Sequence, residues 1–142
     1  MSDIHHSIGI SASSDVTATL VSTPEGLRQW WAEDVELDPD GTVSLGFFNR
    51  ATVYRLRLLE RSSLRVAWHC ETGQEWQGTD LIFALQPQGA GLLLDFVHAN
   101  WREATPYFVS CNTTWGGLMF RLKSAAEGRQ PGPLFSKDAL AY

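Results

Sequence analysis

The middle of the chain alternates apolar and polar residues with a period near two. From Thr42 to His98 the sequence is a succession of short alternating runs separated by turn residues, a pattern that predicts an antiparallel meander. In the runs 54–58 and 64–70 the arginines share one face and the apolar residues share the other. We therefore expect a sheet with one solvated face and one buried face. An earlier alternating run, from Ile4 to Ser11, predicts a first strand.

Two short helices are predicted after this first strand. Residues 13–15 are all N-cap types, and apolar residues follow them at near-helical spacing. The Thr-Pro-Glu sequence at residues 23–25 is a second start signal, for a helix that carries Leu27, Trp30 and Trp31. Because both tryptophans cannot point inward from one short helix, we expect one of them at a cavity mouth or at the surface.

The longest predicted helix lies between Thr105-Pro106 and Gly128. Apolar residues recur there at spacings of three and four, which predicts about five turns with one apolar face. These residues are Phe108, Cys111, Trp115, Leu118, Met119 and Leu122. Gly128 to Pro133 breaks the helix, and residues 134–142 show no clear period. The expected organisation is a single domain over residues 1–133, followed by a loosely held tail.

Composition narrows the class of protein. The 142 residues are 44% apolar and 19% charged, as in one compact domain. The formal net charge of -5, without a clustered basic face, argues against binding nucleic acid. No apolar stretch approaches the roughly 20 residues that span a bilayer, and the first residues do not form a secretory signal. Two cysteines without a CxxC motif favour reduced thiols and a cytoplasmic protein.

No metal site is predicted. The acidic run at residues 33–41 resembles a calcium loop, but Phe47 stands where the closing glutamate is needed and Pro39 stiffens the loop. None of the four histidines forms an i, i+4 helical pair with a glutamate, and the cysteines have no paired spacing that would complete a zinc tetrahedron. We therefore expect neither a metal nor another cofactor.

The order and spacing of the packing patterns resemble a known family. In chain order the patterns are Ile8-x-Ile10-x-Ala12-Ser13, Pro24-Glu25-Gly26-Leu27-x-x-Trp30-Trp31, Leu81-x-Phe83-x-Leu85, Leu94-x-Phe96-x-His98 and Trp115-x-x-Leu118-x-x-x-Leu122-Lys123-x-x-x-Glu127-Gly128. Together they resemble the activator-of-Hsp-90-ATPase-like branch of the SRPBCC superfamily, over residues 4–133. The resemblance implies an α+β helix-grip fold of the START or pollen-allergen type. Such a fold is a curved antiparallel sheet of six or seven strands around a long C-terminal helix, with two short helices after the first strand.

The resemblance also implies a cavity for an apolar ligand between the sheet and the C-terminal helix. Alternation and helical spacing give the candidates for its wall: Trp68, Cys70, Trp76, Phe83, Leu94, Phe96, His98, Cys111 and Trp115. For His98 two roles are open, a satisfied core residue or a polar anchor or proton donor for a ligand. For Trp68 and Trp76 filling the core and lining the pocket are equally favoured, whereas the helix centre favours core filling for Trp115.

Two further groups are interpreted as structural. Cys70 and Cys111 are expected to face inward as inert thiols, and His69 cannot activate Cys70 because adjacent strand residues point to opposite faces. A stripe of arginines is expected on the solvated face of the sheet, with Glu60 as its only acid. The stripe consists of Arg50, Arg55, Arg57, Arg61 and Arg65. A solvated surface is favoured over a partner surface for this stripe.

Three functions remain open at this point. The leading hypothesis is binding of a hydrophobic small molecule or lipid in the cavity. The second is a protein-interaction module of the co-chaperone type, with a chaperone or another protein as partner, acting through the arginine stripe or the acidic loop. The third is a polyketide-cyclase-like enzyme in which His98 and a cavity water act as general acid or base, although no catalytic residue is assigned. Monomer and homodimer are both compatible with the sequence.

Overall fold

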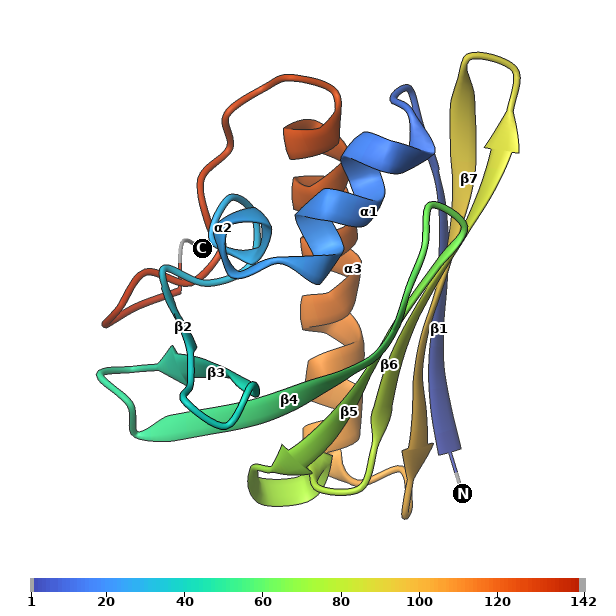
Figure 1. The fold of residues 1–142 in the computed structure, drawn as a ribbon. Helices are drawn as coiled ribbons and strands as arrows, with labels where there is room; N and C mark the ends of the chain where they lie inside the picture. The colour runs from blue at the N-terminus through green and yellow to red at the C-terminus, as the bar shows by residue number, and fades with distance from the viewer. Residues whose placement is uncertain (1, 141–142) are drawn as a thin grey trace.

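Seven antiparallel strands form one curved sheet around a long helix in the computed structural model, which describes residues 2–140 (Figure 1). The strand order is β1-β7-β6-β5-β4-β3-β2. The strands are β1 (Ser2–Ile10), β2 (Asp34–Leu37), β3 (Val43–Phe47), β4 (Thr52–Arg61), β5 (Arg65–Thr72), β6 (Asp80–Gln88) and β7 (Gly91–Trp101). The predicted α+β fold with a curved antiparallel sheet and a C-terminal helix is confirmed.

Three of the four helices begin at a capping side chain, whereas the 3-10 helix begins after Gly73 without one. They are α1 (Ser14–Ser22), α2 (Pro24–Leu27), the 3-10 helix η1 (Gln74–Trp76) and α3 (Pro106–Ala126). The hydroxyls of Ser13, Thr23 and Thr105 each accept a hydrogen bond from a backbone N–H three residues later. These bonds satisfy N–H groups that have no partner within the helix. The three predicted helix starts are therefore confirmed.

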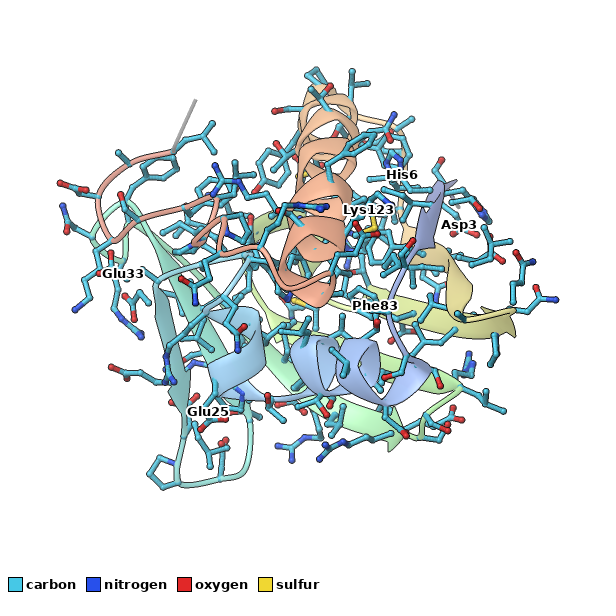
Figure 2. All side chains as sticks on the ribbon, turned by 90° about the horizontal axis from the view of Figure 1, so that it is seen from above. Asp3, His6, Glu25, Glu33, Phe83 and Lys123 are labelled. Atoms are coloured by element: carbon cyan, nitrogen blue, oxygen red, sulfur yellow. The ribbon has the colours of Figure 1, made fainter. Side chains whose placement is uncertain are left out.

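The concave face of the sheet is buried against α1 and α3. The inward positions of β6 and β7 are almost inaccessible to solvent, among them Leu81, Phe83, Leu94 and Phe96. Figure 2 shows Phe83 in the interior between the helices and the sheet, whereas Glu25 lies at the periphery. At the sheet edge Lys123 joins α3 to β1, because its Nζ donates to the Gly9 carbonyl at 2.7 Å. The predicted alternation of buried and solvated faces thus holds.

Both adjacent tryptophans are buried, which corrects the expectation that one of them lies at the surface or a cavity mouth. Trp30 is 0% exposed and Trp31 is 2% exposed. The short helix α2 ends at Leu27, so the two indoles lie in the turns that follow it and need not share one helix face. Trp30 Nε1 donates to the Leu20 carbonyl of α1 at 2.9 Å, while the Trp31 ring contacts Trp115 of α3 at 5.0 Å between centroids.

The segment after α3, residues 129–140, crosses the molecule as a strap. Leu134 is buried and donates its N–H to the Trp30 carbonyl, and Phe135 donates to the Trp31 carbonyl. Arg121 of α3 holds the strap with hydrogen bonds to the carbonyls of residues 131–133. The expected loosely held tail is therefore wrong as far as residue 140, because apolar side chains and backbone bonds dock it. Residues 141–142 of that tail lie outside the described residues.

Candidate functional site

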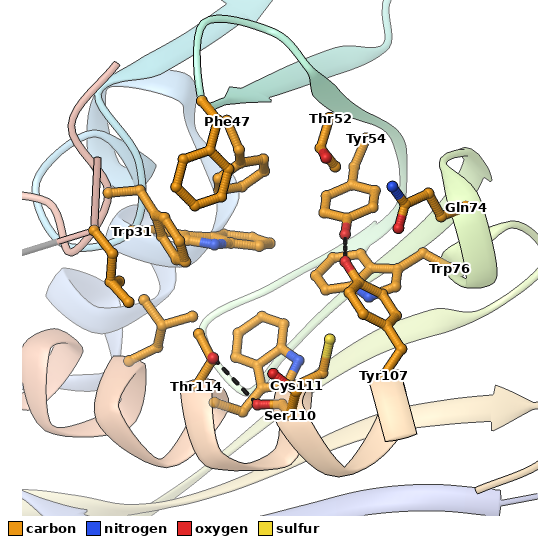
Figure 3. Close-up of a pocket in the computed structure, with 15 residues that line it drawn as sticks. Trp31, Phe47, Thr52, Tyr54, Gln74, Trp76, Tyr107, Ser110, Cys111 and Thr114 are labelled. Carbon is orange, nitrogen blue, oxygen red and sulfur yellow. Dashed lines mark hydrogen bonds between the residues drawn. The ribbon is translucent and has the colours of Figure 1, made fainter. Parts of the chain in front are cut away.

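A cavity of about 300 Å³ lies between α3, the β3–β4 hairpin and the strap (Figure 3). Its apolar wall consists of Trp31, Phe47, Phe48, Trp76, Trp115, Leu118, Phe135 and Leu140. Its polar wall consists of Thr52, Tyr54, Gln74, Tyr107, Ser110, Cys111 and Thr114. Within residues 2–140, no side chain that lines the cavity carries a formal charge. The space is therefore an aromatic pocket with neutral hydrogen-bonding groups on one side.

The periodicities of helix α3 and strand β4 place the polar residues of the wall on the side that faces the cavity. The α3 residues of the wall recur at spacings of three and four, from Tyr107 in the first turn to Leu118, so they share the side of the helix that faces β4. Thr52 and Tyr54 stand two positions apart on β4 and therefore point to the same face. The wall is thus built from two rigid elements that meet across the cavity.

Aromatic rings in contact make this wall rigid. Tyr54 stacks on Trp76 with ring centroids 3.9 Å apart and planes at 6°. Phe135 of the strap meets Phe47 edge to face at 4.9 Å. Ring pairs of this kind contribute about 0.5–1.5 kcal/mol each beyond the area they bury. The pocket therefore has a shape that exists before any ligand enters.

The mouth of the cavity is shaped by an unusual turn between β3 and β4. Phe48, Asn49 and Arg50 have successive φ angles of 52°, 56° and 65°, in the left-handed region, which costs roughly 1–2 kcal/mol for each residue other than glycine. Contacts from elsewhere hold the turn in this form. Asn49 N–H donates to the Lys137 carbonyl of the strap at 2.7 Å, and Arg50 pairs with Asp34 of β2 at 2.8 Å.

The polar groups of the wall are neutral at physiological pH. The hydroxyls of Tyr54 and Tyr107 hydrogen-bond to each other. Burial raises the pKa of Tyr107 to about 12 and, together with the bond to Tyr107, raises the pKa of Tyr54 as well. Burial also raises the pKa of the Cys111 thiol, so this sulfur keeps its proton. The wall therefore presents uncharged hydroxyl and thiol groups that can donate hydrogen bonds.

His98 belongs to a closed hydrogen-bond network behind the cavity. Trp115 Nε1 can only donate, so His98 Nδ1, at 3.1 Å, must accept. The proton therefore sits on Nε2, which donates to Thr79 Oγ1 at 2.8 Å, and Thr79 in turn donates to the Trp76 carbonyl at 2.5 Å. Burial lowers the pKa of His98 to about 3. Both ring nitrogens are occupied, and of the two roles considered the geometry supports the structural one.

The nine predicted wall residues fall into two groups. Trp76, Cys111 and Trp115 line the cavity, whereas the other six are packed in the core and do not. These six are Trp68, Cys70, Phe83, Leu94, Phe96 and His98. The reason is that helices α1 and α3 fill the space over β5–β7. Trp68, for example, donates its indole N–H to the Val21 carbonyl of α1 at 2.8 Å.

The sequence analysis did not identify several wall residues. Two of them could have been identified: Tyr54 alternates with Arg55 on β4 and therefore lies on its apolar face. Tyr107 stands four residues before Cys111, one helical turn away, and therefore lies on the same side of α3. Both signals were present in the sequence. Phe48 and Phe135 carry no such signal, because a turn and an irregular strap position them.

The arginine stripe is paired with more acids than expected. Arg57 bonds Glu71 at 2.7 Å and Arg65 bonds Glu60 at 2.8 Å. Glu60 is thus not the only acid, because antiparallel pairing brings Glu71 of β5 beside β4. Among residues 2–140, no group of three or more His, Cys, Asp or Glu side chains is placed to hold a metal ion. No helix in that range is long and apolar enough to cross a membrane.

Solved structures share this architecture. The solution structure of the Aha1 dimer from Colwellia psychrerythraea matches with a TM-score of 0.80 and 28% sequence identity, over 90% of this chain and 98% of that chain. A START superfamily protein from Mycobacterium smegmatis matches with a TM-score of 0.66 and 16% identity, over 88% of this chain and 97% of that chain. The fold is that of the SRPBCC superfamily, in an Aha1-like form.

A further match with the SRPBCC fold comes from natural-product biosynthesis. DynU16, a protein of the dynemicin biosynthetic locus, matches with a TM-score of 0.73 and 10% identity, over 92% of this chain and 49% of that chain. At such low identity the likeness concerns the fold alone. No family model and no curated protein matches the sequence.

Proposed function

We propose that this SRPBCC protein binds an uncharged hydrophobic small molecule in the cavity between α3 and the sheet. The observation that carries the proposal is the ring-lined cavity without a charged side chain in its wall. Apolar walls favour an apolar ligand, because binding removes the surfaces of both the walls and the ligand from water. A charged ligand would lose its hydration there without gaining a counter-ion. The expected ligand is therefore neutral.

The size of the cavity limits the ligand further. Its volume of about 300 Å³ lies at the lower end of the roughly 300–1,000 Å³ typical of small-molecule sites. A molecule of two or three fused rings, or a short branched chain, fits this range better than a long lipid. We expect micromolar affinity, about -8 kcal/mol.

Equilibrium dialysis of matched neutral, anionic and cationic naphthalene derivatives tests this function. Only the neutral members should bind, with a saturable isotherm. The variant Thr114→Trp, which places an indole in the cavity wall, should abolish this binding. Thr113→Trp, on the exposed side of the same helix, is the matched control and should bind as the unchanged protein does. Absence of saturable binding, or equal binding by Thr114→Trp, would contradict the proposal.

The geometry favours this function over the enzyme alternative. A cyclase-like mechanism through His98 needs an imidazole in contact with the ligand. His98 instead lies behind Trp115 and Trp76, with both ring nitrogens engaged by Trp115 and Thr79. A chaperone contact through the arginine stripe also has less support, because Arg57 and Arg65 pair with acids of the same sheet.

We propose self-association as a second property, since the solved structure from Colwellia psychrerythraea is that of a dimer. On this chain the side of α3 away from the cavity exposes Val109 by 59% and Phe120 by 69%. Sedimentation velocity of the unchanged protein should give a mass near twice 15.8 kDa. The variant Phe120→Lys should sediment with the mass of a single copy. A monomer at all concentrations would contradict the proposal.

A further inference from the structure

The tyrosine pair in the cavity wall, Tyr54 and Tyr107, holds a hydrogen atom that has no oxygen or nitrogen acceptor in the described part of the chain. Their hydroxyls meet end to end at one side of the pocket (Figure 3). Each hydroxyl brings one hydrogen, and their mutual bond uses only one of the two. Among the described residues no other oxygen or nitrogen atom hydrogen-bonds to either hydroxyl. The only further acceptor that the pair reaches among these residues is the sulfur of Cys111, which hydrogen-bonds to Tyr107 and is a weak acceptor, so a stronger acceptor on a bound molecule can take this hydrogen.

The neighbours of the tyrosine pair add donors rather than acceptors. The indole N–H of Trp76, a residue that is only 4% exposed, has no oxygen or nitrogen partner in the described part of the chain, and only the Cys111 sulfur accepts from it. An indole nitrogen can only donate, and the protonated sulfur of Cys111 is at best a weak acceptor. Tyr54, Tyr107, Trp76 and Cys111 thus contribute four hydrogens but only two oxygens. Buried donors that reach only a weak acceptor are costly, so the cluster lacks a strong acceptor.

We propose that the bound molecule presents an uncharged acceptor oxygen, of the carbonyl type, to the tyrosine pair. This inference rests on the proposed function, since it assigns the chemistry of the ligand in the same cavity. The flat aromatic walls around Trp31 and Trp115 accommodate the ring system that carries the carbonyl. The structure therefore assigns the cavity to aromatic or fused-ring ketones, quinones and related carbonyl compounds.

Other ligand chemistries fit the cluster less well. A hydrocarbon would leave the hydroxyl hydrogen and the Trp76 N–H with only the weak Cys111 sulfur as acceptor in the described part of the chain. An amine would add further donors where donors are already in excess. A carboxylate would supply an acceptor, but the wall contains no cation to compensate its lost hydration. A neutral carbonyl oxygen has two lone pairs and satisfies the donors without bringing a charge.

The matched probes are 9-fluorenone and fluorene, which share a ring skeleton and differ by one carbonyl oxygen. The matched protein is the double variant Tyr54→Phe/Tyr107→Phe. Because it removes both partners of one hydrogen bond while keeping their shape, it should fold with little change in stability. Thr113→Val, which removes a hydroxyl from the exposed side of α3, is the control. Dissociation constants are measured by equilibrium dialysis, and the carbonyl stretch of bound fluorenone by infrared difference spectroscopy.

We expect the double variant to bind fluorenone about tenfold more weakly, the effect of losing one neutral hydrogen bond, and to bind fluorene unchanged. The carbonyl band should move to lower frequency in the unchanged protein and in Thr113→Val, but not in the double variant. If both probes bind and neither affinity nor band depends on the tyrosine pair, a bound water already completes the cluster, and this inference is wrong while the proposed function stands. If neither probe binds the unchanged protein, the proposed function fails as well.

Discussion

Two regions of the concave face are built from the same types of aromatic residue but are packed differently. Over β5–β7 the rings are packed without space, and the polar atoms of His98 and Trp115 are bonded to each other. Under the β3–β4 hairpin the rings surround a cavity, and the indole N–H of Trp76 has no oxygen or nitrogen partner within residues 2–140. Ring content therefore does not distinguish a core from a binding site. The space left between the rings does.

The two regions differ because different elements pack over them. Helix α1 lies across β5 and β6, and α3 packs on β7 through the contact of Trp115 with Phe96. The β3–β4 end has the first half of α3 and the strap above it, and the strap carries few large side chains. The aromatic residues of the β3–β4 end consequently form a wall with space between them. The predictions below test this contrast between the packed core and the cavity.

The largest effect is expected for Trp115→Ala, because Trp115 belongs to both regions. Its ring is 4.3 Å from Phe96 and 5.0 Å from Trp31 between centroids. Truncation should cost about 3–5 kcal/mol of the free energy of unfolding and leaves His98 Nδ1 without its donor. Denaturant unfolding measures this cost, with Val16→Ala on the exposed surface of α1 as the control. A loss below about 1 kcal/mol would show that the packed core is not packed as described.

An intermediate effect is expected from pH, through His98 in the packed core. Its pKa is about 3 in the folded protein against 6.5 for the unperturbed side chain, so below pH 6.5 the unfolded chain binds a proton that the folded chain does not. The free energy of unfolding should therefore be fully present above pH 6.5. It should fall by up to about 1.4 kcal/mol per pH unit as the pH decreases toward 3.

Unfolding curves between pH 4.5 and 6.5 measure this slope for His98. Glu127 is held at a pKa of about 2, chiefly by hydrogen bonding from Lys123, and it contributes to the pH dependence below this window. His98→Gln preserves an acceptor for Trp115 and a donor for Thr79 but does not titrate. The slope should decrease by the contribution of one proton in this variant. An identical slope in both proteins would mean that His98 is already accessible to protons in the folded state.

The smallest effect is expected for the two thiols, and it separates the regions directly. Burial raises the pKa of Cys70 in the packed core to about 12, and it also raises the pKa of Cys111 in the cavity wall. Both should react with a maleimide far more slowly than in the unfolded protein, and Cys111 should react before Cys70. A bound neutral ligand should slow only Cys111. Mass spectrometry after timed labelling gives the order, and faster reaction of Cys70 would reverse the assignment of the two regions.

Regular elements were predictable from the sequence because their periodicity is local. The spacing from Phe108 to Leu122 fixes α3, and the alternation in β6 and β7 fixes the buried face that contains His98. The caps at Ser13, Thr23 and Thr105 fix the helix starts. These features depend on neighbours within one or two turns of the chain, so a single sequence reveals them.

The candidate site was predictable only in part, because its shape depends on distant segments. Trp76, Cys111 and Trp115 were identified as inward-facing. The position of the empty space was not, since it depends on where α1 ends and on how the strap docks through Leu134 and Phe135. Neither the end of α1 nor the docking of the strap produces a periodic pattern in the sequence. The burial of both Trp30 and Trp31 was not predicted, because α2 ends at Leu27 and does not continue through them.

The six indole N–H groups offer the most direct test of the central claim, that the cavity binds an uncharged hydrophobic ligand. Trp31, Trp76 and Trp115 line the cavity, whereas Trp30, Trp68 and Trp101 do not. In proton–nitrogen correlation spectra, titration with 9-fluorenone should give saturable shifts for the three cavity indoles and small ones for Trp30 and Trp68, whose N–H groups are bonded to α1. If no indole shifts with saturation, or if only the indoles outside the cavity do, the protein does not bind its ligand where we propose.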